Sequence, residues 1–151
     1  GPAGRLHLSF RPDHEQRRRG LAPAGFWIHP QTDAHDQISA AVWFASQPSR
    51  YPRFSREALA DLIEGFGLEP HLAKPMYMLS TGSKRKVWLS AAFAAGAPLT
   101  LIDQPFAALD GPAIRLLREL LQEAAGVKDR AWVIADFEAP ADVSLAATIA
   151  L

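Results

Sequence analysis

The chain has 151 residues, which suits one domain or a large piece of one. Hydrophobic residues make up 48% and charged residues 21%, the balance of an ordinary globular protein. The 16 basic residues equal the 16 acidic ones, which argues against a dedicated nucleic-acid-binding protein because such proteins usually carry a basic excess. The absence of cysteine excludes disulfides and thiolate metal ligands.

The first quarter of the chain predicts two short strands separated by a loop. Residues 4–10 alternate apolar and polar side chains, the pattern of a half-buried strand. Residues 12–20 are polar and include three successive arginines, which predicts a solvated loop. The apolar run at 26–28 predicts a second strand, which Pro30 ends.

The middle of the chain has the periodicity of helices. We expect one helix over residues 36–46 and another over 56–66, with Ser55 as its N-cap and glycine at its end. Residues 70–78 predict a connector. The apolar residues that carry the helical spacing are Ile38, Ala41, Val42 and Ala45 in the first helix and Leu59, Leu62, Ile63 and Phe66 in the second.

The second half predicts alternating helices and buried strands. Helices are expected at 84–95 and 111–125, and apolar strands at 98–103, 132–135 and 147–151. Continuous apolar strands joined by helices indicate a parallel sheet that is covered on both faces. The fold class is therefore α/β.

The strand at 98–103 ends in an acid, Asp103. Open α/β sheets bind ligands at the carboxyl ends of their strands, and a carboxylate there can hold Mg²⁺ beside nucleotide phosphates. The alternative interpretation is an acid that only begins a turn. Upstream, Ser80 or Thr81 can cap a helix, and Gly82 lets a ligand approach the backbone. The start of such a helix is an anion-binding site.

Two motifs in this order resemble those of the ATP-binding cassette (ABC) ATPases. LSTGSKRK at 79–86 is similar to the ABC signature, and LTLIDQPFAALD at 99–110 is similar to the Walker B strand and the D-loop. The resemblance implies a P-loop NTPase-like parallel sheet core with an α-helical subdomain. Residues 1–151 would form a partial ABC ATPase domain whose N-terminal part is missing, with the helical subdomain and its signature helix at about 37–97.

The resemblance also assigns roles to individual positions. Gln104 stands at the position of the family's catalytic Glu, and Asp136 at that of the switch His. Asp103 and Gln31, in a segment similar to the Q-loop, would bind the metal. The residues expected to contact the nucleotide are Gln31, Ser80, Thr81, Gly82, Ser83 and Asp110.

Several positions depart from the family pattern. No Gly-Lys pair of a Walker A loop occurs, and we expect that loop to lie upstream of Gly1. Gln104 cannot accept a proton from water, so general-base catalysis is lost. Asp136 would repel phosphate unless a cation intervenes. In the signature, Thr81 and Ser83 replace the usual Gly and Gln.

The resemblance therefore implies the ATP-binding subunit of a bacterial ABC transporter that couples ATP binding and hydrolysis to transport, slowly because of Gln104 and Asp136. It looks closest to haem-exporter ATPases of cytochrome c maturation. The expected partners are a transmembrane subunit and a second nucleotide-binding subunit, with no nucleic acid. The expected location is cytoplasmic, peripheral on the inner membrane. ATP and Mg²⁺ are the expected cofactors of the full-length protein, without tight binding to these 151 residues alone.

Two other functions compete with transport. A non-catalytic regulatory or scaffold protein with the cassette fold would explain both altered positions. A soluble ABC ATPase that acts on DNA or ribosomes is disfavoured by the neutral charge. The basic run at 84–86 predicts a solvated helix start, and the five histidines show no metal-ligand spacing on one helix face.

Overall fold

The computed structural model describes residues 25–29, 31–136 and 142–145. The strands predicted at 4–10 and 147–151, the loop at 12–20 and Pro30 lie outside these described residues.

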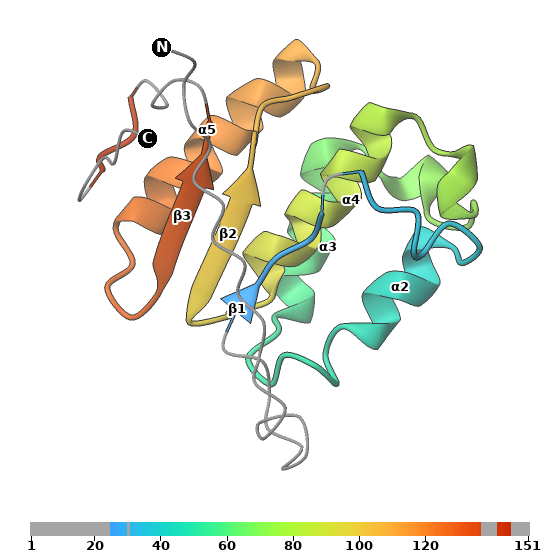
Figure 1. The fold of residues 1–151 in the computed structure, drawn as a ribbon, viewed down its shortest axis with the longest axis horizontal. Coiled ribbons are helices and arrows are strands. Elements are labelled where there is room, and N and C mark those ends of the chain that lie inside the picture. The colour runs from blue at the N-terminus through green and yellow to red at the C-terminus, as the bar shows by residue number, and fades with distance from the viewer. Residues whose placement is uncertain (1–24, 30, 137–141, 146–151) are drawn as a thin grey trace.

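A three-stranded parallel sheet forms one layer of the described structure, and the helices form the other (Figure 1). Its strands are β1 (Gly25–Phe26), β2 (Leu99–Asp103) and β3 (Ala131–Ala135), in the spatial order β1-β2-β3. Phe26 pairs with Thr100, and Asp103 pairs with Ala135. The middle of β2 is buried, as expected for an apolar strand of a parallel sheet. The α/β class and the parallel sheet predicted from the sequence are thus confirmed.

The helices begin where a side chain can cap them. Ser55 accepts the Ala58 amide at 3.0 Å before α3 (Arg56–Phe66), and Gly67 ends that helix in the left-handed conformation with φ 66°. The other α-helices are α2 (Ala40–Ser46), α4 (Thr81–Ala94) and α5 (Gly111–Ala125), and two short 3-10 helices, η1 (Glu69–His71) and η2 (Met76–Met78), occupy the predicted connector.

Helix α2 differs from its prediction. It begins at Ala40 because the Ser39 hydroxyl accepts the Val42 amide at 3.1 Å. Its buried residues are Ala40, Trp43 and Phe44, whereas Val42 is 57% exposed. Two large aromatic side chains bury more apolar surface than the smaller side chains of the predicted face, so they decide which side of the helix turns inward. The face predicted by spacing, which comprises Ile38, Ala41, Val42 and Ala45, is therefore exposed.

Other boundaries shift by a few residues. Helix α4 begins at Thr81 rather than 84, because Ser80 provides its cap. The strand predicted at 26–28 is β1 at Gly25–Phe26.

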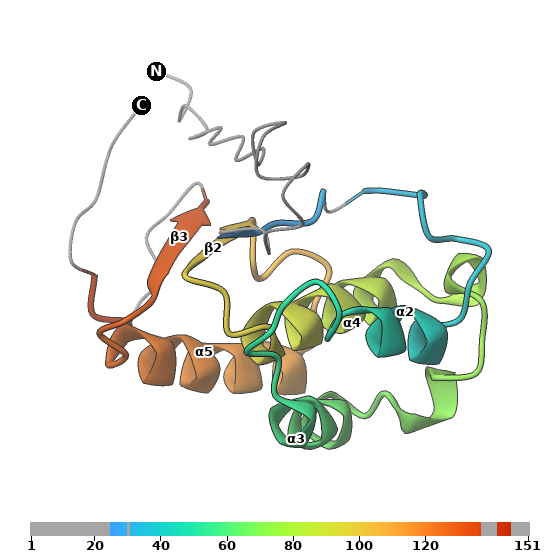
Figure 2. The same cartoon turned by 90° about the horizontal axis from the view of Figure 1, so that it is seen from below.

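The described helices lie on one side of the sheet (Figure 2). Their shared core includes the fully buried Met76, Val87 and Leu117 and the edge-to-face rings of Trp43 and Trp88, whose centroids are 4.7 Å apart. Of the two covered faces predicted for the sheet, the described residues cover one. Helices α2, α3 and α4 all follow β1 and precede β2, within the span predicted for a helical subdomain, whose limits stay a prediction. No helix in the described ranges has the length and hydropathy that a bilayer crossing requires.

Candidate functional site

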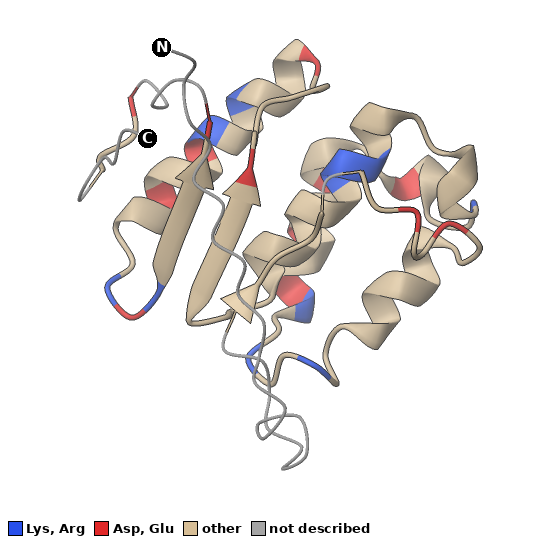
Figure 3. Ribbon diagram, viewed as in Figure 1, with Lys and Arg blue, Asp and Glu red and all other residues tan. Residues whose placement is uncertain are grey.

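The candidate site lies where β2 and β3 end. Asp103 closes β2, and its register partner Ala135 closes β3, directly before Asp136. Figure 3 shows acidic residues at these two strand ends and basic residues at the nearby start of α4. Parallel strands bring their carboxyl ends to one edge, so two segments far apart in sequence place acids side by side there. Asp103 is half-buried and Asp136 is exposed.

The loop that joins β2 to α5 contains two residues in the left-handed conformation. Gln104 has φ 48° and Ala108 has φ 60°, a conformation that costs a non-glycine residue about 1–2 kcal/mol. The Gln104 amide donates to the Ala135 carbonyl at 2.7 Å, which extends the β2–β3 pairing beyond Asp103 and offsets part of that cost. Gln104, at the position expected for a catalytic Glu, is thus fixed by backbone bonding to the neighbouring strand.

Gly82 brings the start of α4 against this loop. A Cβ added at Gly82 would meet the Ala108 carbonyl oxygen at 2.6 Å, a distance that real Cβ atoms essentially never show. Only glycine therefore allows the two backbones to approach as they do. The signature-like turn and the D-loop-like segment, predicted as separate motifs, form one packed unit.

The first turn of α4 presents groups suited to an anion. Ser80 Oγ accepts the Ser83 amide at 3.1 Å and donates to Ser83 Oγ at 3.0 Å. Neither capping contact uses the amides of Thr81 and Gly82, which as first-turn donors have no partner within the helix. Ser80 and Thr81 are exposed, so a ligand that approaches from outside the chain can reach this turn.

Asp110 joins the same unit from the far end of the loop. Its carboxylate caps α5 by accepting the Ala113 amide at 3.0 Å, and Lys86 donates to it at 3.2 Å. The hydrogen bond from Ala113, followed by that from Lys86, lowers the pKa of Asp110 below its usual range. Asp110 is therefore a carboxylate at neutral pH and connects the start of α5 to α4.

The basic run at 84–86 is not a solvated helix start, which corrects that prediction. Lys84 pairs with Asp36 at 2.7 Å and Lys86 with Asp110, while Arg85 is only 8% exposed. Arg85 Nη2 donates to the carbonyls of Asp103, at 3.1 Å, and Gln104. No pattern in the sequence predicts this burial, because Arg85 lies between two lysines whose side chains bind other partners.

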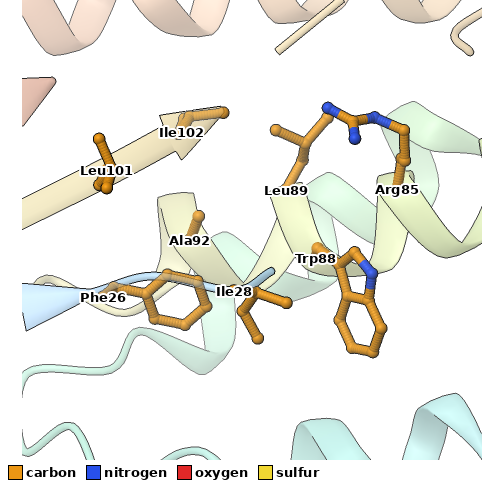
Figure 4. Close-up of a pocket in the computed structure, with 8 residues that line it drawn as sticks. All are labelled: Phe26, Ile28, Arg85, Trp88, Leu89, Ala92, Leu101 and Ile102. Carbon is orange, nitrogen blue, oxygen red and sulfur yellow. The ribbon is translucent and has the colours of Figure 1, made fainter. Parts of the chain in front are cut away.

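Arg85 also lines a small cavity of about 30 Å³ between α4, β1 and β2 (Figure 4). The other lining residues are apolar or aromatic: Phe26, Ile28, Trp88, Leu89, Ala92, Leu101 and Ile102. Within the described part of the chain, Arg85 Nε and Trp88 Nε1 are buried without a hydrogen-bond partner. A cavity of this size holds about one water molecule, so it is too small for a nucleotide.

Two residues are expected from the sequence to bind Mg²⁺, and both carry oxygen ligands of the kind that this ion prefers. Asp103 offers a carboxylate at the sheet edge, and Gln31 offers an amide in the turn that follows β1, where it is exposed. In the described ranges no hydrogen bond joins these two residues, and no group of three or more His, Asp or Glu is placed to hold a metal. One or two protein oxygens completed by phosphate and water is how Mg²⁺ commonly binds.

No protein-family model matches the chain. Curated relatives do match it. It is 34% identical over 120 residues to the cytochrome c biogenesis ATP-binding export protein CcmA of Pseudomonas putida, covering 76% of this chain and 54% of that protein. It is 30% identical over 127 residues to the lipopolysaccharide export system ATP-binding protein LptB of Escherichia coli, covering 80% and 52%. The chain thus spans about half the length of the curated relatives it matches.

Solved structures share the fold. A putative ABC transporter ATP-binding protein from Pyrococcus furiosus superimposes with a TM-score of 0.63 at 20% identity, over 85% of this chain and 62% of that one. An ATP-binding subunit of an ABC transporter gives 0.62 at 24%, over 80% and 50%. The parallel sheet with acids at its carboxyl edge is that of a P-loop NTPase-like α/β protein. The signature-like turn packs on the D-loop-like segment, and the relatives are ATP-binding proteins of this kind. The chain therefore belongs to the ABC ATPase family and comprises part of a cassette.

Proposed function

We propose that the chain is part of the ATP-binding subunit of a bacterial ABC transporter, in which ATP binding and slow hydrolysis drive transport. The observation that carries this proposal is the close contact of Gly82 with the Ala108 carbonyl. It joins the signature-like turn to the loop that follows Asp103, so both motifs act at one edge of the sheet. The similarity to CcmA and LptB, which are both ATP-binding proteins of export systems, supports the same role.

Within this proposal the site residues divide between two nucleotides. Asp103 and Gln31 would hold Mg²⁺ at the chain's own site, and Asp110 would face the junction with a second subunit. Bound Mg-ATP supplies the phosphoanhydride whose hydrolysis drives the conformational cycle. The donors for an ATP held mainly by the second subunit are Ser80, Thr81, Gly82 and Ser83, which all lie in the capped first turn of α4.

We propose that hydrolysis is slow because of Gln104. Its amide can hydrogen-bond a water molecule but cannot accept a proton, so no general base stands at this position. Its backbone is already fixed by the bond to Ala135. A side chain with a carboxylate would therefore start from the same anchored position.

The test is the replacement Gln104→Glu in the full-length protein. Restoring a general base is expected to raise steady-state ATP turnover by roughly 100-fold or more, with little change in ATP affinity. Gln37→Glu, at an exposed position before α2, adds the same charge away from the site and should leave turnover unchanged. Unchanged turnover in Gln104→Glu, with ATP still bound, would contradict the assignment of this position.

The proposed partners are a transmembrane subunit and a second nucleotide-binding subunit, at the cytoplasmic side of the inner membrane. An exposed apolar surface formed by Ile38, Val42, Tyr77 and Met78 supports the first partner. The two segments that carry it lie together, because the Met76 amide donates to the Ile38 carbonyl at 2.9 Å. Tyr77 is 60% and Met78 is 59% exposed, and exposed apolar side chains that lie together are typical of a protein interaction site.

A second candidate is a non-catalytic regulatory protein that keeps the cassette fold. Gln104 without a carboxylate and an acid at position 136 favour it. The two candidates differ in nucleotide binding. A full-length protein that shows no ATP-dependent change in calorimetry or thermal stability would support the scaffold and exclude the transporter subunit.

A further inference from the structure

We infer that Arg85 is a positioning residue that clamps the carboxyl ends of β2 and β3 to α4, and that Asp136 completes the charge balance of this clamp. The inference concerns how the site is held together. It rests on contacts within the chain and not on the proposed function, so a protein that binds no nucleotide would still show it.

The first argument is the contrast between the burial of Arg85 and its direct partners. The side chain is 8% exposed, yet the acceptors it reaches, the backbone oxygens of Asp103 and Gln104, are neutral carbonyls. A guanidinium withdrawn from water is costly unless an anion compensates its charge. Its carbonyl partners fix its position but cannot supply that compensation.

The second argument is which acids surround it. Burial lowers the pKa of Arg85 below its ordinary value, and the negative charges of Asp103 and then Asp136 act in the opposite direction. These are the residues that end β2 and follow β3. Asp103 belongs to the strand end that Arg85 already binds through hydrogen bonds, so Asp136 is the acid that adds the end of β3 to the clamp.

The third argument is the arrangement of the backbone to which Arg85 donates its hydrogen bonds. The Arg85 guanidinium bonds to the carbonyl of Gln104, whose amide bonds to the Ala135 carbonyl at 2.7 Å. Asp136 is the first residue after β3. Hydrogen bonds thus link α4 to the end of β2 and the end of β2 to the end of β3. The negative charge of Asp136, directly after β3, then acts on the positive charge of Arg85. Figure 4 shows the Arg85 side chain leaving α4 toward the end of β2.

This role changes how Asp136 acts in the site. An isolated acid at this position would repel a phosphate, but an acid whose charge is matched by Arg85 repels it far less. The cation that offsets the charge of Asp136 is thus the guanidinium group of Arg85.

The experiment is hydrogen exchange at the Gln104 amide in the full-length protein. In Asp136→Asn, which alters an exposed side chain and should fold, this amide is expected to exchange roughly tenfold faster relative to the buried Leu117 amide in α5. A residue that only adds overall stability would change both amides together. An unchanged ratio would overturn the inference.

A double-mutant cycle tests the pairing itself. The variants Arg85→Met, Asp136→Asn and their combination are compared with Arg53→Met and Asp129→Asn, whose charges lie 3.7 Å apart with both side chains about two-thirds exposed. The coupling is the factor by which the effect of the double variant on the folding equilibrium constant departs from the product of the two single effects. We expect this factor to be at least about threefold larger for Arg85 and Asp136 than for the exposed control pair, because exposed ion pairs contribute little to stability. A coupling no larger than the control would contradict the clamp.

Arg85→Lys separates charge from hydrogen bonding and guards against a Met variant that fails to fold. Lysine keeps the charge but cannot span two carbonyls with a planar fork. It should retain most of the coupling to Asp136→Asn while still speeding exchange at Gln104. Loss of the coupling in Arg85→Lys would mean that Asp136 does not act through the charge.

Discussion

At the scale of single residues, Gly82 matters because two backbones meet there. The family resemblance explains this glycine by close approach to a nucleotide, and the structure shows an approach within the chain itself, to the Ala108 carbonyl. The two requirements are compatible, but only the second is independent of any ligand. The glycine is thus needed to keep the loop at 104–110 beside α4, whatever binds there.

Gly82→Ala is therefore expected to destabilise the fold. The added methyl would sit 2.6 Å from a backbone oxygen, which cannot rotate away, and overpacking of this kind costs about 1–3 kcal/mol. Denaturant unfolding measures the loss. Gly111→Ala is the control, since its Cβ would meet nothing closer than 3.5 Å, at the end of the Arg115 side chain. Equal stability of the two variants would show that the loop moves aside without cost.

Arg85 illustrates a limit of sequence reasoning at the same scale. Three basic residues in a row at the start of a helix usually form a solvated face. Here each has a different environment, because α4 turns about 100° per residue and only Arg85 faces the end of β2. Which of three similar side chains is buried depends on where the sheet lies, and the local sequence does not contain that information.

At the scale of secondary-structure elements, side-chain caps define the helix starts. Ser39, Ser55, Ser80 and Asp110 each accept an amide from the first turn of the following α-helix. Such caps depend on residues three positions apart, so a sequence can reveal them, as it did for α3 with Ser55 and for α4 with Ser80 as one of two candidates. The predicted strands at 98–103 and 132–135 agree with β2 and β3 for the same reason: their apolar runs are short and bounded by turns.

Ser55 and Ser80 cap their helices in the same way, so a comparison of the two can separate a structural role from a ligand-binding role. Ser55→Ala and Ser80→Ala each remove one hydrogen bond to a first-turn amide, at 3.0 Å and 3.1 Å, so each should cost about 1 kcal/mol of unfolding free energy. Under the proposed function, only Ser80→Ala should weaken ATP-dependent dimer formation of the full-length protein, measured by sedimentation. A similar loss in Ser55→Ala would place the effect in stability rather than in the signature turn.

At the scale of the whole molecule, Ile38, Val42, Tyr77 and Met78 form an exposed apolar surface among the described residues. It exists because Trp43 and Phe44 turn the opposite side of α2 inward. The backbone bond from Tyr77 to the Asp36 carbonyl, at 3.1 Å, then brings η2 beside it. An apolar surface built from two separate segments suits a protein partner.

Val42→Glu and Tyr77→Glu test this surface in the full-length protein. Both positions are exposed, so each change should alter the unfolding free energy by less than about 0.5 kcal/mol. Binding to the proposed transmembrane subunit, measured by co-purification or interferometry, should fall at least roughly tenfold because a charge would be buried in the contact. Ala60→Glu, exposed on α3, adds the same charge elsewhere and should bind normally. Normal binding by both surface variants would exclude this face as the contact.

The sequence by itself determined the alternation of helices and strands, the cap of α3, and the two motifs that indicate an ABC ATPase. Those features depend on neighbours a few residues apart, for which apolar spacing and capping chemistry suffice. Only the tertiary structure decided that aromatic residues turn α2, that Gly82 lies against the Ala108 carbonyl, and that Arg85 bonds to the carbonyls of Asp103 and Gln104 at the end of β2. Each of these depends on segments separated by many residues, and packing in three dimensions fixes which of several equivalent side chains is buried.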